Sequence, residues 1–272
     1  MTTLLFKVEG AGNDFLLGTG DWAKRLSGEP ELAVRLCDRR LGVGADGVLA
    51  LGPEVDGKVS LDYRNADGST ALFCANATRC AARAAVELFG SSPRLIVETG
   101  WGPIPAEVRG TEVALELPPP GVLPRHLEIE SPPSVGDLWL VEVGVPHLVA
   151  VAEGLAELDL GAVAPPLRRH PALGQEGANV NLYEIDADDV VAVRSWERGV
   201  EGETLCCGSG VVAVALGVMA RRRLRRVVCV PRSGDRLTVE ALGDPPDCPT
   251  RFTGPARMVA GIEPAEELLR VR

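Results

Sequence analysis

The sequence predicts an α/β protein made of two similar domains, each built around a buried central helix. Strand-like and helix-like runs alternate along its 272 residues. Two helical runs, one ending near Leu88 and one spanning about 208–223, are crowded with small or β-branched apolar residues, as in helices buried on most faces. A polar turn and a cysteine, Cys74 or Cys207, precede each run. We therefore expect two related halves with a cysteine at the start of each central helix.

Shorter patterns predict the remaining elements. A helix is expected over 31–41, where apolar residues recur and Gly42 ends the run. Strands are expected where apolar or β-branched runs lie between turn residues, at 4–8, 48–51, 59–63, 94–98, 112–117, 138–143, 178–185, 190–196, 227–230, 236–241 and 256–262. The prolines at 118–120 and Gly121 interrupt the series, because proline fits neither a helix interior nor a strand ladder. The expected domains are 1–117, to which 263–272 returns, and 118–262.

Composition excludes several classes of partner. The net charge of −10 argues against nucleic acid and anionic membranes as partners. Only 4% of the residues are aromatic, which leaves few side chains on which the bases of single-stranded nucleic acid could stack. The longest apolar run, 211–220, is half of the roughly 20 residues that span a bilayer, so no membrane segment is expected. An odd count of seven cysteines without a secretion signal predicts reduced, cytoplasmic thiols. No C-x-x-C occurs and no histidine lies near a cysteine pair, so no metal site is expected.

The two cysteines at helix starts indicate proton-transfer chemistry. A helix N-terminus carries a partial positive charge and free N–H groups, which lower a thiol pKa and can hold a carboxylate. If Cys74 and Cys207 flank one bound molecule, one can remove a proton as thiolate while the other donates one as thiol. Such a pair inverts a carbon centre. A single cysteine before an apolar helix is more often a core residue, so the interpretation depends on the pair.

Several blocks of the chain resemble the diaminopimelate epimerase family. They occur in the family's order and span nearly the whole chain. The blocks are KVEGAGNDF (7–15), RLGVGADG (40–47), NADGS (65–69) with CANATRC (74–80), GVPH (144–147), NVN (179–181) and WERGVEGETLCCGSG (196–210). The last block is long and specific. On these motifs the chain is identified as similar to that family.

The resemblance implies a fold and an activity. The fold is α/β, with two pseudo-symmetric domains, each a mainly antiparallel sheet or barrel wrapped around a central helix. The activity is the cofactor-independent interconversion of LL- and meso-diaminopimelate, a step toward lysine and cell-wall precursors. Cys74 and Cys207 match the family's catalytic cysteines. The substrate-binding positions carry over to Asn13, Asn65, Ala75, Asn76, Asn179, Glu197, Arg198, Gly208 and Ser209.

Roles for these residues follow from their chemistry and from the resemblance. Arg198 is expected to bind the distal carboxylate of the substrate through its planar fork. Glu197 and the asparagines are expected to bond the distal ammonium and carboxylate, and backbone N–H groups near Asn76, Gly208 and Ser209 the reacting carboxylate. For Asn13 and Asn65 the alternative is ordinary turn chemistry, which asparagine favours.

The chain departs from the family at a few positions. Glu9 replaces a histidine, Ala75 and Ala77 replace two glycines, and Val145 replaces an asparagine that helps to bind the distal end of the substrate. A lost hydrogen-bond partner for a buried polar group costs about 1–3 kcal/mol. The departures therefore bear on the identity of the substrate more than on the chemistry. Cys206 stands where the family has alanine or serine and is not a catalytic candidate.

Other signals are discounted. The pattern G-x-G-x-x-G at 42–47 follows a helix and precedes a strand, the reverse of a dinucleotide-binding loop. None of the three lysines lies in a convincing pyridoxal site, so no cofactor is expected. His147 and His170 are expected at the surface or in turns, and Cys80 in the core.

Three readings of the function stay open. The first is a diaminopimelate epimerase, which Glu197 and Arg198 favour. The second is a racemase of another amino acid on the same fold, for example histidine, which Val145 and the two alanines favour. The third is a catalytically silent amino-acid-binding protein. All three take a small amino acid, and the sequence leaves the oligomeric state open, a homodimer included.

Overall fold

The computed structural model describes residues 4–186 and 190–269. The chain divides into two compact units. Unit 1 runs to Leu115 and resumes at Gly254, and unit 2 comprises Glu116–Thr253. The chain thus passes from unit 1 to unit 2 after Leu115, two residues before the boundary expected after residue 117. Within the described parts of the chain, no helix is long and apolar enough to span a membrane.

Residues 254–262 belong to unit 1, whereas the sequence had suggested the second domain. The reason is strand pairing: β18 (Arg257–Ile262) lies antiparallel to β1 (Leu5–Gly10). Residues 263–269 also lie in unit 1, and 270–272 of the expected returning segment fall outside the described residues. The first domain is therefore discontinuous, and its returning segment is longer than expected.

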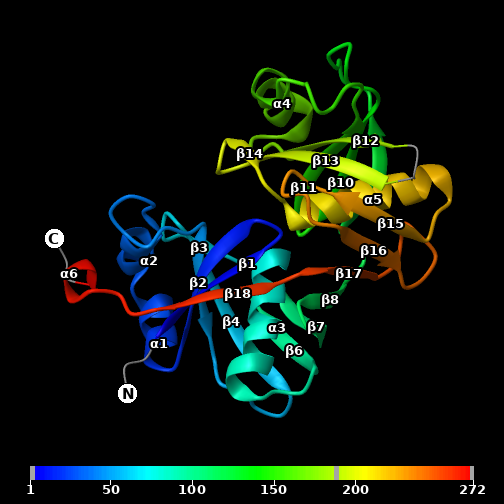
Figure 1. The fold of residues 1–272 in the computed structure, drawn as a ribbon. Coiled ribbons are helices and arrows are strands. Elements are labelled where there is room, and N and C mark those ends of the chain that lie inside the picture. Colours follow the sequence, from blue (N-terminus) through cyan, green and yellow to red (C-terminus); the bar gives the residue numbers. More distant parts are fainter. Residues whose placement is uncertain (1–3, 187–189, 270–272) are drawn as a thin grey trace. The chain divides into compact units, whose positions relative to one another are not determined.

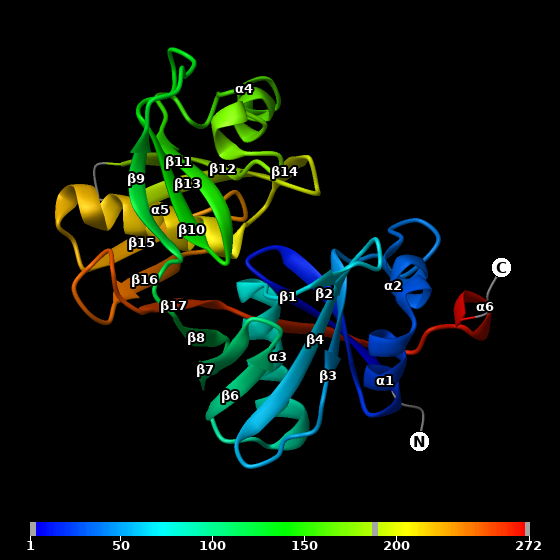
Figure 2. The same ribbon diagram turned by 180° about the vertical axis from the view of Figure 1, so that it is seen from behind.

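Unit 1 is a mostly antiparallel sheet wrapped around one long helix, α3 (Ala75–Phe89) (Figure 1). The other strands of the unit are β2 (Asn13–Thr19), β3 (Gly47–Leu51), β4 (Lys58–Asn65), β5 (Thr70–Ala71), β6 (Arg94–Thr99), β7 (Gly102–Arg109) and β8 (Glu112–Leu117). They pair in the order β18–β1–β2–β3–β4–β6–β7–β8, with β2–β3 and β4–β6 parallel, and β5 pairs with β4. Strands β6 and β7 lie against α3 (Figure 2).

Unit 2 repeats this layout around a second long helix, α5 (Gly208–Arg222). Its strands are β9 (Val122–Leu127), β10 (Leu138–Val143), β11 (Val145–Val151), β12 (Asn179–Ile185), β13 (Val190–Glu197), β14 (Gly202–Thr204), β15 (Arg226–Val230), β16 (Leu237–Ala241) and β17 (Thr250–Pro255). The order is β9–β10–β11–β12–β13–β15–β16–β17, with β11–β12 and β13–β15 parallel, and β14 pairs with β13.

The two units therefore have the same order of strands, and each pair of neighbouring strands in one unit has the same parallel or antiparallel orientation as the corresponding pair in the other. Corresponding strands also bury the same positions: buried and partly buried residues follow one another in the same order in β1 and β10, and likewise in β2 and β11. This duplication confirms the predicted fold class of two pseudo-symmetric α/β halves, each wrapped around a central helix.

Both central helices are shaped by their surroundings. Every residue of α3 from Ala75 to Ala82 is buried, and the helix ends at Gly90 in the left-handed conformation, with φ of 67°. In α5 nearly all residues up to Met219 are buried, and the helix ends in exposed arginines that suit its negative end. The smaller helices are α1 (Asp21–Gly28), α2 (Pro30–Cys37) and α6 (Glu266–Leu269) in unit 1, and α4 (Leu160–Arg168) with the short 3₁₀ turn 171–173 in unit 2.

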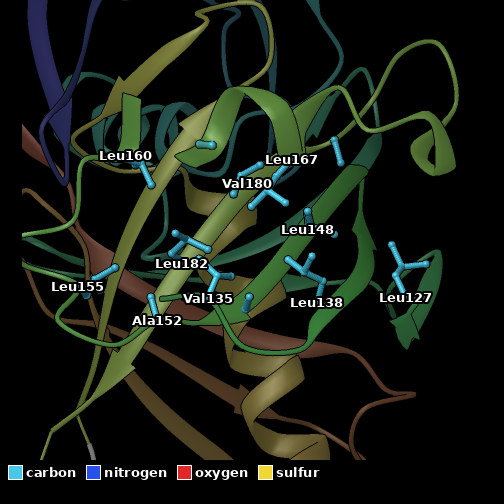
Figure 3. Close-up of a cluster of buried hydrophobic side chains, with 13 residues drawn as sticks. Leu127, Val135, Leu138, Leu148, Ala152, Leu155, Leu160, Leu167, Val180 and Leu182 are labelled. Carbon is cyan, nitrogen blue, oxygen red and sulfur yellow. The ribbon is translucent and has the colours of Figure 1, made fainter. Parts of the chain in front are cut away.

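The sheet of unit 2 has two differently used faces. Leu148, Val180 and Leu182 join a buried apolar cluster with Leu160 and Leu167 of α4 (Figure 3). Alternate residues of a strand point to opposite faces. The intervening side chains of β11 and β12 consequently point toward α5, and the polar ones among them belong to the site described next.

Candidate active site

In unit 1 the site is organised around Cys74, the residue that caps the N-terminus of α3. Its backbone is extended, with φ of −145° and ψ of 116°, and its carbonyl accepts hydrogen bonds from the backbone N–H and the hydroxyl of Thr78, both at 2.9 Å. Cys74 is partly exposed, whereas the other six cysteines are buried. A reachable thiol thus stands at the positive end of a helix, where the sequence predicts it.

Two of the predicted asparagines lie beside this thiol. Asn13 Oδ1 is 3.7 Å from Cys74 Sγ and accepts a hydrogen bond from Asn76 Nδ2 at 3.3 Å. Asn76 Oδ1 in turn accepts one from Arg79 Nη2 at 2.7 Å. Arg79 is fully buried and also donates to the carbonyl of Pro255, at 3.3 Å. This guanidinium fixes the orientation of Asn76.

Sequence reasoning overlooked Arg79, although the pattern held a signal. It is a charged residue within the alanine-rich part of the helix and stands three positions after Asn76, which places both side chains on one helix face.

A charged network holds Asn13 from the other side. Asn13 Nδ2 donates to Asp46 Oδ2 at 2.6 Å, so its oxygen faces Cys74 and Asn76. Arg39 bridges Asp46 and Asp14 at 2.7 Å each, and Lys7 pairs with Asp14 at 2.5 Å. The aspartates escaped the sequence analysis as site residues, although both lie in the family blocks.

The same network perturbs the titration of Asp14. Burial by itself raises the pKa of this carboxyl, but hydrogen bonds from Arg39 and Lys7 outweigh it and lower the pKa from 3.8 to about 2. The carboxylate thus favours the folded state at any pH above about 4. That contribution fades as the pH falls from about 4 to about 2.

We expect Asp14→Asn to lower the free energy of unfolding near neutral pH by up to about 2 kcal/mol, reduced by solvent screening because the pair is not fully buried. Urea unfolding of both proteins over a pH series measures the difference. The gap between wild type and variant should close as the pH falls toward about 2. A gap that stays constant over that range would contradict the assignment.

Asn65 ends β4 and forms a turn. Its side-chain Nδ2 donates to Ser69 Oγ at 2.9 Å, and its backbone N–H donates to the Ser69 carbonyl at 2.9 Å. The side chain therefore takes part in the turn chemistry that asparagine favours. Contact with substrate stays a prediction for this residue.

The alanines beside Cys74 fit their positions without backbone strain. Ala75 and Ala77 lie in the first turn of α3, both are buried, and neither has a positive φ. The methyl groups thus occupy ordinary helical positions. Any effect of these residues on the substrate comes from the space that the methyl groups take.

In unit 2 the equivalent position belongs to Cys207, which caps α5. Its φ is −96° and its ψ 107°, and its carbonyl accepts from the N–H of Val211 at 2.9 Å, as Cys74 does in α3. Cys207 Sγ lies 3.7 Å from Ser209 Oγ. Gly208, also predicted for substrate binding, is buried in this first turn.

The helix terminus does not lower the pKa of Cys207 in unit 2, in contrast to the expectation from sequence. Burial and the nearby charge of Glu197 raise the pKa of this thiol well above its usual range. Hydrogen bonds from Ser209 and from the N–H of Gly210 oppose the rise but do not outweigh it. A sequence shows a helix terminus, but the depth of the burial appears only in the fold.

Three further predicted residues of unit 2 lie at the start of β12, where Asn179 stands, and at the end of β13, where Glu197 stands with Arg198 after it. Asn179 Oδ1 accepts from the backbone N–H of Arg198 at 2.7 Å, and Glu197 Oε1 accepts from the hydroxyl of Thr204. The guanidinium of Arg198 lies 3.6 Å from the carboxylate of Glu176, which is 86% exposed. Because the carboxylate partner is so exposed, the pair is weak, and the half-buried guanidinium of Arg198 can take another anionic partner in its place.

His147 corrects the sequence analysis, which had it at the surface or in a turn. It lies in β11 and is fully buried. Its Nδ1 is 3.1 Å from Asn181 Nδ2, and Asn181 Oδ1 accepts from the hydroxyl of Ser195 at 2.8 Å. Burial, assisted by the charge of Arg198, lowers the pKa of His147 to about 3. The ring is therefore neutral near pH 7.

Asn181 and Ser195 were missed by sequence reasoning. The signal was the spacing of Asn179 and Asn181, which puts two polar side chains on one face of an otherwise apolar strand.

Two solved structures that carry the names of other families have a similar fold. A PhzF family phenazine biosynthesis protein of Enterococcus faecalis superposes with a TM-score of 0.73 at 15% identity, covering 96% of this chain and 98% of that chain. A probable proline racemase of Agrobacterium radiobacter K84 gives a TM-score of 0.67 at 18% identity, covering 97% and 93%. At such identities the likeness concerns the fold alone.

Sequence relatives are more informative. A family model described as diaminopimelate epimerase matches residues 5–117 and 139–259. A diaminopimelate epimerase of Cyanothece sp. is 33% identical over 99% of this chain and 99% of that protein. One of Synechococcus sp. is 35% identical over 92% and 94%, and one of Archaeoglobus fulgidus is 37% identical over 77% and 79%. The chain therefore belongs to the diaminopimelate epimerase family and is an isomerase.

Proposed function

We propose that the protein interconverts LL- and meso-diaminopimelate by proton transfer at Cα between two cysteines, on the route to lysine and cell-wall precursors. The carrying observation is the equivalence of Cys74 and Cys207: each caps the central helix of its unit, and the units share one strand order. Family membership supports the choice of reaction.

The proposed step balances without a cofactor. The thiolate of one cysteine takes the Cα proton, so a C–H bond breaks and an S–H bond forms. The thiol of the other cysteine gives its proton to the opposite face of the carbon. The reaction requires both sulfur atoms to reach the same Cα, and each turnover exchanges their protonation states.

The remaining residues bind and orient the substrate. Free N–H groups at the starts of α3 and α5 hold the reacting carboxylate and stabilise the charge that develops on it when the proton leaves. Arg198 binds the distal carboxylate in a bidentate fashion. Asn13, held by Asp46, and Asn76, held by Arg79, contribute polar groups whose orientation is already set. Binding therefore orders few of these side chains further.

A second candidate is a racemase of another amino acid, such as histidine. Val145 opens β11 in the way that Asn13 opens β2, so unit 2 has an apolar side chain where unit 1 has an amide. A less polar distal end would suit that difference. The retained Arg198 and Glu197 favour diaminopimelate. The third candidate, a silent amino-acid-binding protein, predicts binding without exchange.

The deciding experiment measures incorporation of solvent deuterium at Cα by NMR over a panel of amino acids in D₂O. We expect rapid exchange with LL- and meso-diaminopimelate and little with histidine, lysine or proline. The double variant Cys74→Ala/Cys207→Ala supplies the background rate. Exchange with another amino acid only would identify the protein as a racemase of that amino acid. Binding without exchange would identify it as a catalytically silent amino-acid-binding protein.

A further inference from the structure

The strand that carries Asn13 begins directly after a tight turn. Strands β1 and β2 are joined by only two residues, Ala11 and Gly12, and Gly10 pairs with Asn13 on either side of them. Both joining residues have a positive φ, 54° for Ala11 and 82° for Gly12, as in the type I′ turns that close tight hairpins. The conformation of this β1–β2 turn (residues 10–13) therefore determines where the backbone of Asn13 lies.

Ala11 makes the turn costly. In the left-handed conformation the Cβ of an ordinary residue comes too close to the following carbonyl oxygen, so glycine or asparagine is preferred at such a position. Ala11 adopts this conformation although it is not glycine, and its side chain is fully buried. A strained residue of this kind persists only where the surrounding structure holds it in place.

The side chain of Glu9 supplies such a contact. Its Oε2 accepts a hydrogen bond from the backbone N–H of Gly12 at 3.0 Å, and its Oε1 accepts one from Arg257 Nη1 at 2.6 Å. Arg257 lies opposite Glu9 in β18, so the carboxylate connects the turn to the last strand of the unit. Only 18% of the Glu9 side chain is exposed, and solvent therefore screens these contacts less than contacts at the surface.

The two partners of Glu9 are both donors, and for this reason a carboxylate suits the position. A carboxylate offers one acceptor oxygen to each partner, whereas a glutamine amide or a neutral imidazole offers an acceptor to only one. The presence of a glutamate rather than a histidine at residue 9 thus agrees with the presence of Arg257 opposite it in β18.

The β1–β2 turn lies against the first turns of α3, which Cys74 caps. A Cβ atom added to Gly10 would lie 3.3 Å from the carbonyl oxygen of Asn76 and 3.4 Å from Cys80 Sγ, so the end of β1 approaches the helix closely. From this turn Asn13 Oδ1 reaches Cys74 Sγ at 3.7 Å and Asn76 Nδ2 at 3.3 Å. A small change in the turn would alter both distances.

We propose that Glu9 is a positioning residue: its carboxylate, paired with Arg257, holds the β1–β2 turn and thereby sets the place of Asn13 beside Cys74. Asp46 fixes the orientation of the Asn13 side chain, whereas Glu9 fixes the backbone that carries it. The effect on the reaction rests on the proposed function, but the contact between Glu9 and the turn does not.

Amide hydrogen exchange followed by NMR measures this contact in the wild-type protein. The N–H of Gly12 should be protected from exchange, because Glu9 accepts its hydrogen bond. Glu9→Gln keeps the shape of the side chain but has one acceptor fewer, so exchange of the Gly12 amide should become about tenfold faster. A Gly12 amide that exchanges freely in the wild type would overturn the proposal, whatever the variants do.

Two further variants serve as controls. Glu240→Gln removes the carboxylate from another cross-strand pair, the one with Arg226 in unit 2, and should leave the Gly12 amide protected. Arg257→Lys keeps a cation opposite Glu9 and should retain most of the protection. Full protection of Gly12 in Glu9→Gln, or an equal loss of it in Glu240→Gln, would show that Glu9 does not hold the turn.

The inversion kinetics of the same variants test the role in the reaction. We expect Glu9→Gln to lower kcat/KM for LL-diaminopimelate by about threefold to tenfold, the effect of weakening one oriented hydrogen bond, and Glu240→Gln to leave it unchanged. A merely structural role would lower the free energy of unfolding without changing kcat/KM of the folded enzyme.

The two readouts separate this proposal from the proposed function. If the wild type inverts no amino acid, while Gly12 is protected in it and loses protection in Glu9→Gln, the proposed function fails and the contact that holds the turn stands. If the wild type inverts diaminopimelate and Glu9→Gln inverts it equally fast with an unprotected Gly12 amide, the positioning role of Glu9 is refuted.

Discussion

Cys74→Ala and Cys207→Ala should each abolish the inversion of diaminopimelate. In the proposed mechanism each sulfur is the proton acceptor in one direction and the proton donor in the other, and alanine can do neither. Acid–base groups of this kind contribute about 10²–10⁴-fold to a rate, and inversion needs both proton transfers, one from each group. Chiral chromatography of the product, starting from pure LL isomer, measures inversion independently of simple proton exchange.

Cys206→Ala is the matched control for this experiment. Cys206 adjoins Cys207 in the chain and is buried like it, but it precedes the residue that caps α5. It should retain inversion at close to the wild-type rate. If either Cys74→Ala or Cys207→Ala retains most of the inversion activity, the two-cysteine mechanism is wrong. If Cys206→Ala loses inversion, the assignment of the chemistry to Cys207 rather than Cys206 is wrong.

Gly210→Ala should damage both stability and activity. The new methyl group would lie 2.1 Å from Asn181 Oδ1 and 3.2 Å from the Cβ of Cys207. The amide oxygen is buried and already bound by Ser195, so it has little freedom to move. Overpacking of this kind costs about 1–3 kcal/mol in unfolding free energy. Any shift that relieves this clash displaces either Asn181, the hydrogen-bond partner of His147, or Cys207. The inversion rate should therefore fall as well.

Gly217→Ala, on the same helix, provides the opposite expectation. Its added Cβ would meet Val149 Cγ1 at 3.7 Å, an ordinary contact. Replacing glycine by alanine in a helix interior adds about 0.5–1 kcal/mol of stability. Urea unfolding of the two variants in parallel gives the comparison. Equal stabilities would mean that Asn181 does not occupy the space beside Gly210.

The central helices could be predicted from the sequence because their pattern is self-contained. The alanine-rich run after Cys74 ends at Gly90, and the apolar run after Cys207 ends in arginines; each stop has a local cause. The two cysteines and the polar residues near them follow from the same short segments. These features need no knowledge of which strands pair.

Elements that depend on tertiary packing escaped the sequence analysis. Helix α4 contains Pro165 and Pro166, which local rules exclude from a helix interior, yet Asp159 caps it and its apolar face joins the cluster of unit 2. Strand β2 begins with Asn13 and Asp14, which look like a turn until their partners Asp46 and Arg39 are brought near from elsewhere in the chain.

Buried polar groups were the hardest to foresee. A histidine after a glycine and a proline is typical of a turn, and only the neighbouring strand supplies the amide that makes burial of His147 possible. The same holds for Arg79, whose acceptors include a carbonyl far along the chain. Long-range partners of single side chains leave no periodic trace in a sequence.

The return of the chain to its beginning has a consequence for synthesis on the ribosome. Strand β1 keeps an unpaired edge until β18, the last strand of the described chain to be synthesised, can pair with it. The uninterrupted half from Glu116 to Thr253 can mature earlier, while the half that was translated first must wait for the tail. A nascent or truncated polypeptide that lacks β18 therefore exposes an unpaired strand edge, which can pair with another chain.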